Sequence, residues 1–163
     1  MASLSDALVR HLLDGRYIAS FATHNPNGLL HIVAVWFWFD GEDIYVATSS
    51  RSRKARNLQA NPQVAVMIDA RDPIASYGVT VTGTAQVLTG ESSRKYNAEI
   101  HRKYLSQTAL ADPKVGPAFA AWDDVTVRLT PGSMIAWDMR QADQQVFGGA
   151  FKNNPTYLLP LER

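Results

Sequence analysis

The sequence predicts a mainly β fold: an antiparallel β-barrel with a few peripheral helices. Segments with strand character outnumber helical segments. Two short turn sequences, at 25–28 (Asn-Pro-Asn-Gly) and 40–41 (Asp-Gly), separate neighbouring strands, and connections this short require antiparallel pairing. Residues 79–87 alternate small apolar side chains with threonine and glutamine, which is the pattern of a strand with one buried face.

The composition is that of a globular protein, and it predicts one domain over residues 1–163. The chain is 46% hydrophobic and carries a formal charge of only +1, which gives no electrostatic reason to expect a nucleic-acid partner. It has no cysteine, which excludes disulfides and thiolate chemistry. The N-terminus lacks the features of a targeting signal, and the most apolar stretch is too short to span a membrane, so we expect a cytoplasmic protein.

The first half of the chain is expected to begin with a short helix that Gly15 ends, because Leu4, Leu8 and Leu12 recur at helical spacing. A helix capped by Ser52 is expected to end before Pro62. The strands expected in this half are 17–23, 30–39, 44–48 and 64–68.

In the second half, Gly83 predicts a bulge or bend within the alternating strand 79–87. Residues 91–105 are expected to form a helix with Tyr96, Ile100 and Tyr104 on one face. We expect a loop over 112–117, a helical turn over 118–122, strands 125–129 and 134–138 separated by a turn at Pro131, and an irregular tail beyond Gln141.

The strand over residues 30–39 is apolar at almost every position, so both of its faces must be covered. Trp36 to Phe39 would otherwise form a large exposed aromatic patch, and such patches mark partner or ligand surfaces. A second copy of the chain is the simplest cover. The sequence therefore predicts a homodimer that forms through this strand.

The segment 48–58 is the strongest indication of a binding site. Hydroxyls lie at the end of a strand, and Arg51, Arg53, Lys54 and Arg56 follow at the start of a helix. Helix N-termini attract anions, and arginine and lysine side chains add phosphate-binding groups. The pattern favours a phosphorylated ligand, and a solvated run of charges is the alternative.

The order of these segments resembles the pyridoxamine 5′-phosphate oxidase-like, FMN-binding split-barrel family. The resemblance runs from Arg16 to Leu105 and depends on the Ser52-Arg53-Lys54 run, the following Arg-Asn-Leu and Asn-Pro, and residues 81–85 (Val-Thr-Gly-Thr-Ala). It implies an antiparallel split β-barrel and a homodimer that holds two cofactor sites at its interface.

The resemblance also implies which residues hold the cofactor. Ser52, Arg53 and Lys54 would bind its phosphate, with Arg56 nearby and Thr48 and Ser49 lining the same site. The strand residues along the isoalloxazine ring would be Ile32, Val33, Ala34, Val35 and Trp36. No catalytic side chain can be assigned, because in flavin chemistry the cofactor transfers the hydride.

The resemblance covers proteins that use FMN and proteins that use the deazaflavin F420. We expect an FMN-dependent oxidoreductase acting on a small organic substrate, with F420 as the alternative cofactor. The arginine-rich C-terminal motif of true pyridoxamine phosphate oxidases is absent: the tail has only Arg140, Lys152 and Arg163. We therefore expect a substrate other than vitamin B6.

A non-catalytic flavin- or haem-binding protein is the alternative of another class, with His24 or His31 as the axial ligand of a haem. The histidine spacing matches no metal-binding motif, so no metal site is expected. Trp122 and Trp137 are interpreted as core residues, with a role in covering a cofactor ring as the alternative.

Overall fold

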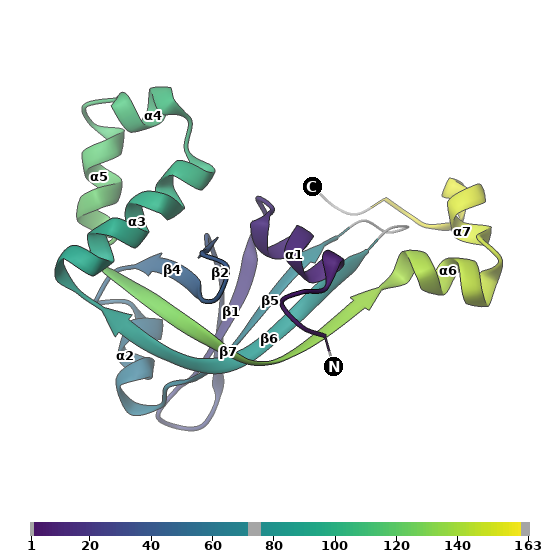
Figure 1. Ribbon diagram of the computed structural model, residues 1–163, viewed down its shortest axis with the longest axis horizontal. Coiled ribbons are helices and arrows are strands. Elements are labelled where there is room, and N and C mark those ends of the chain that lie inside the picture. The colour runs from purple at the N-terminus through teal and green to yellow at the C-terminus, as the bar shows by residue number, and fades with distance from the viewer. Residues whose placement is uncertain (1, 72–75, 161–163) are drawn as a thin grey trace.

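A seven-stranded antiparallel sheet forms the centre of the protein, as a computed structural model that describes residues 2–71 and 76–160 shows (Figure 1). The strand order is β2-β1-β5-β6-β7-β4-β3. The strands are β1 (Ala19–His24), β2 (Leu30–Val35), β3 (Trp38–Phe39), β4 (Ile44–Thr48), β5 (Gln63–Ala70), β6 (Tyr77–Leu88) and β7 (Val125–Asp138). The antiparallel fold predicted from the short turns is confirmed.

The sheet is curled because of the connection between its two edge strands. β2 and β3 lie at opposite ends of the strand order, yet only Trp36 and Phe37 separate them in the chain. The three Cα–Cα steps from Val35 to Trp38 span at most about 11 Å, so the two edges of the sheet must come close together there. This arrangement is the incompletely closed barrel expected from the sequence.

The barrel interior holds the main hydrophobic core. Its fully buried members include Phe21 of β1, Val46 of β4, Val66 of β5 and Val81 of β6. Helix α1 (Ala7–Asp14) adds Val9, Leu12 and Leu13 to the same core, and Gly15 ends it as expected. Helix α2 (Arg53–Ala60) buries Leu58 in the core and packs on β1 and β6.

The two longest strands, β6 and β7, pair along their whole length. Their register shifts between Thr82 and Gly83, which confirms the predicted bulge. The expected turn at Pro131 is wrong: Pro131 pairs with Gly83 inside the continuous strand β7. A Pro-Gly sequence is typical of a turn, but here it forms the irregularity opposite the bulge in the partner strand.

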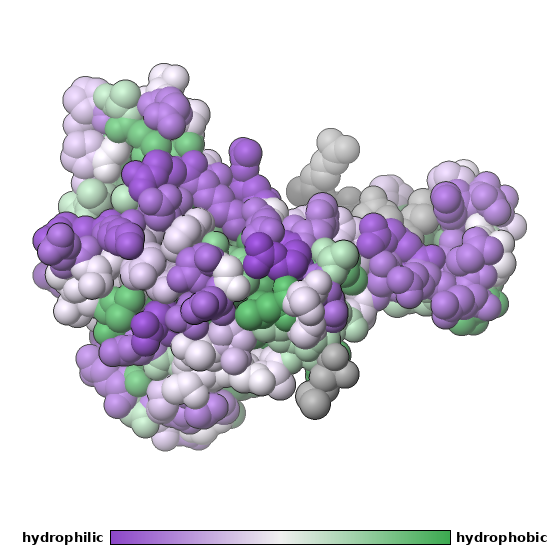
Figure 2. Space-filling model, in the orientation of Figure 1, coloured by the Kyte–Doolittle hydropathy of each residue, from purple (hydrophilic) through white to green (hydrophobic). Residues whose placement is uncertain are grey.

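Helices α3 (Gly90–Tyr104), α4 (Gln107–Ala111) and α5 (Val115–Trp122) form one group beside β4 and β7 (Figure 1). Helix α3 confirms the prediction for 91–105. The loop expected over 112–117 is wrong in its second half, because α5 already begins at Val115. Apolar surface is visible over α4 and α5 (Figure 2), where neither helix has a buried residue.

The tail beyond β7 is helical, so the expectation of an irregular tail is wrong. It consists of α6 (Met139–Phe147), α7 (Ala150–Asn153) and the 3-10 helix η1 (Pro155–Tyr157). Gly148 and Gly149 turn the chain with positive φ, and the buried Asp143 carboxylate accepts hydrogen bonds from the amides of Phe151 and Lys152. These helices project from the barrel as a separate arm (Figures 1 and 2). Within the described ranges, no helix has both the length and the apolar character needed to cross a bilayer.

Side chains of the same chain pack against the aromatic cluster at residues 36–39, and a partner over Trp36 stays a prediction. The Trp36 ring stacks on Tyr104 of α3 at 5.0 Å and on Phe119 of α5 at 5.5 Å. Trp38 packs against Tyr45 and Tyr96. The sequence could not reveal this cover because α3 and α5 follow more than fifty residues later.

Candidate functional site

A cavity of about 490 Å³ opens between β2, the end of β4, the start of α2 and the end of α5. This volume lies within the range of about 300–1,000 Å³ that is typical of ligand pockets. The residues that line it are Ile18, Ala34, Val35, Trp36, Ala47, Thr48, Lys54, Phe119, Trp122 and Asp123. One end is therefore cationic, and the walls are mainly apolar and aromatic.

The cationic end is built by the junction of β4 and α2. Ser52 is the N-cap of α2, and its Oγ accepts a hydrogen bond from the Ala55 amide at 3.2 Å and from the Thr48 hydroxyl at 3.1 Å. The preceding loop is held by Asp124, which accepts hydrogen bonds from the amide and the hydroxyl of Ser50, both at 2.6 Å. The helix N-terminus is thus fixed beside the cavity, where its dipole favours an anion.

Lys54 is the cation that this junction places in the cavity. Burial lowers the pKa of its ammonium group, and the Asp123 carboxylate opposes part of that shift. Among the described residues, no carboxylate lies within 4 Å of the Lys54 Nζ. A partly buried ammonium without a close counter-ion is well suited to binding an anionic ligand.

The aromatic side of the cavity comes from a part of the chain that sequence reasoning did not assign to the site. Phe119 and Trp122 of α5 line the cavity together with Trp36, which follows β2. Trp122 is 76% exposed, so its interpretation as a core residue is wrong. It also lines a neighbouring pocket of about 530 Å³ together with Ser49, Arg51, Ser52, Ala121 and Asp124.

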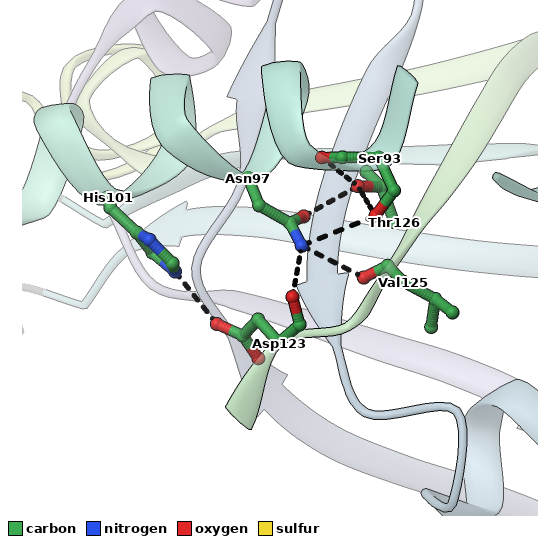
Figure 3. A network of polar contacts seen from close by, with 6 residues as sticks. All are labelled: Ser93, Asn97, His101, Asp123, Val125 and Thr126. Carbon is green, nitrogen blue, oxygen red and sulfur yellow. Dashed lines mark hydrogen bonds and ion pairs between the residues drawn. The ribbon is translucent and has the colours of Figure 1, made fainter. Parts of the chain in front are cut away.

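Asp123 joins the cavity to a buried polar network (Figure 3). Its Oδ2 lies 2.8 Å from Nε2 of the buried His101, and its backbone carbonyl accepts a hydrogen bond of 2.7 Å from Asn97. Thr126, fully buried, bonds to both Asn97 and Ser93. Because Ser93, Asn97 and His101 are spaced four apart, they share one face of α3. That polar spacing was the only sequence signal for this network.

The predicted site residues divide into three groups. Ala34, Val35, Trp36, Thr48 and Lys54 line the cavity together, and Ser49 and Ser52 line the neighbouring pocket. Of the other strand residues, Ile32 faces outward and Val33 packs against the core. Arg53 and Arg56 are exposed on α2 and line neither pocket.

The histidines considered for haem or metal lie elsewhere. His24 pairs with Leu30 and His31 pairs with Thr23 in the β1–β2 ladder, so the two histidines lie on opposite faces of the sheet, and neither lines the cavity. Residues 2–71 and 76–160 contain no group of three or more histidine and carboxylate side chains placed to hold a metal ion. Tyr77 lies outside the cavity lining and contacts Tyr17, with 3.1 Å between the two hydroxyls.

Comparison with known proteins identifies the family of this chain. The family model described as pyridoxamine 5′-phosphate oxidase matches residues 5–129, which include the whole barrel up to the middle of β7 and every residue that lines the cavity. The chain belongs to this family. No curated protein matches the chain.

Solved structures of family-like proteins share the fold at low sequence identity. A conserved hypothetical protein from Mycobacterium tuberculosis is 23% identical with a TM-score of 0.69, and the match covers 85% of this chain and 87% of that one. An F420 reductase is 22% identical with a TM-score of 0.58, covering 77% and 94%. The haem storage protein of Vibrio cholerae is 20% identical with a TM-score of 0.61, covering 78% and 90%. The shared fold therefore accompanies different ligands.

Proposed function

We propose that this protein is an oxidoreductase that binds a phosphorylated flavin-type cofactor, FMN or F420, in the cavity between β2, α2 and α5. One observation carries the proposal: the cavity combines a cationic helix N-terminus with aromatic walls. A phosphorylated ring needs both features, and family membership adds support.

The residues present fit such a group. Lys54 and the free amides of the first turn of α2 would hold the phosphate, and Thr48, whose hydroxyl donates to Ser52 Oγ, would line the same end of the cavity. Ala34, Val35 and Trp36 would lie along the ring, and their apolar surface would exclude water from it. When bound, the cofactor supplies hydride-transfer chemistry, while the protein supplies position and electrostatics. FMN and F420 both carry a phosphate and a planar ring, so the cavity suits either cofactor. FMN remains the lead candidate and F420 the alternative.

Haem is less well matched by this cavity. Of the described residues that line it, none is a histidine, and the nearby His101 is bonded to Asp123. A haem-binding function would require a different part of the surface around His24 or His31. We therefore retain it only as an outcome of the binding experiment below.

We also propose a homodimer, formed through the outer face of the sheet. Ile32 of β2 is 62% exposed and Ile135 of β7 is 67% exposed on this face. Between them lie small side chains, among them Ala22 and Ala65, in register with Ile32. A face that joins exposed isoleucines to small side chains across several strands suits self-association about a two-fold axis.

The cofactor is tested by titrating the purified, cofactor-free protein with FMN and, separately, with F420, followed by fluorescence. We expect micromolar or tighter binding of one of the two. Lys54→Ala should weaken that binding by about 1.5–3 kcal/mol, the contribution of a hydrogen bond to a charged group.

Lys95→Ala is the matched control, because Lys95 is exposed on α3 and does not line the cavity. Its affinity should equal that of the wild-type protein. Binding of neither cofactor would overturn the oxidoreductase proposal, and haem would then be titrated with His31→Ala as the variant. Equal affinity of Lys54→Ala and wild type would remove Lys54 from the phosphate site.

A further inference from the structure

We propose that the cavity contains a second subsite, formed by Asp123, Phe119 and Trp122, that selects planar aromatic substrates carrying a cationic nitrogen or an N–H donor. As a substrate subsite it rests on the proposed function, since the cofactor would occupy the Lys54 end of the same cavity. Asp123 is then the residue that determines specificity.

The position of Asp123 supports this role. It lies in the cavity lining together with two aromatic residues of α5, at the point where α5 ends and β7 is about to begin. Asp123 Oδ2 is bonded to His101, whereas Oδ1 has no hydrogen-bond partner among the residues that the structure describes. One carboxylate oxygen thus remains available to accept a hydrogen bond from a ligand.

The aromatic residues define the shape of the ligand. Phe119 is fixed by its stacking on Trp36 and by its contact with the His101 ring, at centroid distances of 5.5 and 5.4 Å. Trp122 is largely exposed at the mouth and presents its ring to both adjoining pockets. Flat aromatic surfaces favour a flat ring, and stacked aromatic pairs contribute beyond the area that they bury.

The charge of Asp123 defines the chemistry of the ligand. A carboxylate in a largely apolar cavity favours cations and N–H donors and disfavours anions, and these preferences are stronger away from bulk water. Lys54 lines the same cavity and offsets this field. A phosphate bound at Lys54 would neutralise the positive charge of that lysine. The cavity is therefore expected to prefer a cationic ring more strongly when the cofactor is present.

His101 acts as a positioning residue. Its ring is buried between α3 and α5, and its Nε2 fixes one oxygen of Asp123 so that the other remains directed away from the network (Figure 3). The Asn97 amide holds the backbone of Asp123 at the same time. The carboxylate is therefore pre-organised, which reduces the entropy lost when a ligand binds.

The test is calorimetric titration of the protein with 2-naphthamidine, 2-naphthamide and 2-naphthoate, which share a ring and differ in charge. We expect the amidine to bind at least about tenfold more tightly than the naphthoate, as a charge-assisted hydrogen bond requires. Asp123→Asn should abolish this preference. Glu91→Gln removes the same charge at an exposed position of α3 that lines neither pocket, and should preserve it.

Two further variants test the role of His101. His101→Gln keeps an N–H donor toward Asp123 and should retain the preference for the amidine, whereas His101→Leu should reduce it. Equal preference in both variants would overturn the positioning role. Equal affinity of the wild-type protein for amidine and naphthoate would overturn the subsite itself.

Cofactor titrations of the same preparations separate this inference from the proposed function. If FMN or F420 binds and the amidine preference is absent, only the subsite fails. If neither cofactor binds and the preference is present, the oxidoreductase proposal fails while Asp123 still selects cationic rings.

Discussion

At the scale of single residues, the polar network under the cavity combines a structural and a positioning role. Thr126 is fully buried on β7, and its hydroxyl bonds to the Ser93 carbonyl at 3.0 Å and to Asn97 Oδ1 at 2.6 Å. Asn97 in turn holds the chain at Asp123. The same hydrogen bonds that attach α3 to β7 therefore also fix one wall of the cavity.

Thr126→Val tests this network without changing side-chain shape or strand propensity. Loss of the hydroxyl leaves buried polar atoms of Ser93 and Asn97 with fewer partners, so the free energy of unfolding should fall by about 1–3 kcal/mol. Urea denaturation measures the change. Thr130→Val, at an exposed position of the same strand, should stay within about 0.5 kcal/mol of wild type. Equal effects of the two substitutions would contradict this account.

Lys103 makes stability depend on pH. Its ammonium lies 3.9 Å above the centre of the Phe37 ring and donates a hydrogen bond to the Leu13 carbonyl at 3.2 Å. Burial nevertheless lowers its pKa to about 8, with Arg16 adding to the shift and Asp14 opposing it. The unfolded chain, with a pKa near the ordinary 10.5, binds more protons between these two values. The contribution of Lys103 to the free energy of unfolding therefore rises from pH 8 to pH 10.5.

Lys103→Met removes this titration. The free energy of unfolding of wild type minus that of the variant should increase between pH 7 and pH 10, as measured by urea denaturation at each pH. Lys95→Met, at an exposed lysine of the same helix, should give a difference that stays constant with pH. A constant difference for Lys103→Met as well would show that the lysine is not perturbed by burial.

At the scale of elements, the bulge between β6 and β7 depends on the absence of a side chain at Gly83. A Cβ atom there would lie 2.1 Å from the Thr130 carbonyl oxygen and 2.9 Å from Leu129 Cδ1. The first of these neighbours is backbone within a paired strand and cannot move without loss of the ladder. Gly83 is thus required by the close approach of the two strands.

Gly83→Ala should lower the free energy of unfolding by about 1–3 kcal/mol or more, because the added methyl overpacks the bulge. Thermal and urea denaturation both report this loss. Thr84→Ala, next to it on the exposed face, serves as the control and should have a much smaller effect. A stable Gly83→Ala variant would mean that the bulge can shift its register.

Local chemistry explains which elements could be predicted from sequence. β4 and α2 were predicted almost to the residue because Asp40-Gly41, Ser52 and Asn61-Pro62 mark their boundaries. The cationic end of the site, Thr48 and Lys54, was predicted for the same reason. β7 was divided in error, since only pairing with Gly83 shows that Pro131 lies within a strand. The α5 wall was missed because the contact of Phe119 with Trp36 is long-range.

At the scale of the whole molecule, the outer face of the sheet is the surface on which the proposed dimer depends. Ile32→Glu places a charge on the exposed side of edge strand β2 and should convert the dimer to a monomer, because an unpaired charge would be buried on association. Light scattering coupled to size-exclusion chromatography gives the mass. Thr108→Glu, exposed on α4, should leave the mass unchanged. A dimeric Ile32→Glu variant would exclude this face as the interface.

The strand order also determines when the barrel can close during synthesis. β7 lies between β6 and β4, so the two halves of the sheet are joined only after residues 125–138 have been made. Until then β4 and β6 each have an open edge, and open edges can pair with other chains. Contacts this distant in sequence also slow folding. We therefore expect a chain truncated before Val125 to aggregate, because these two strand edges stay unpaired.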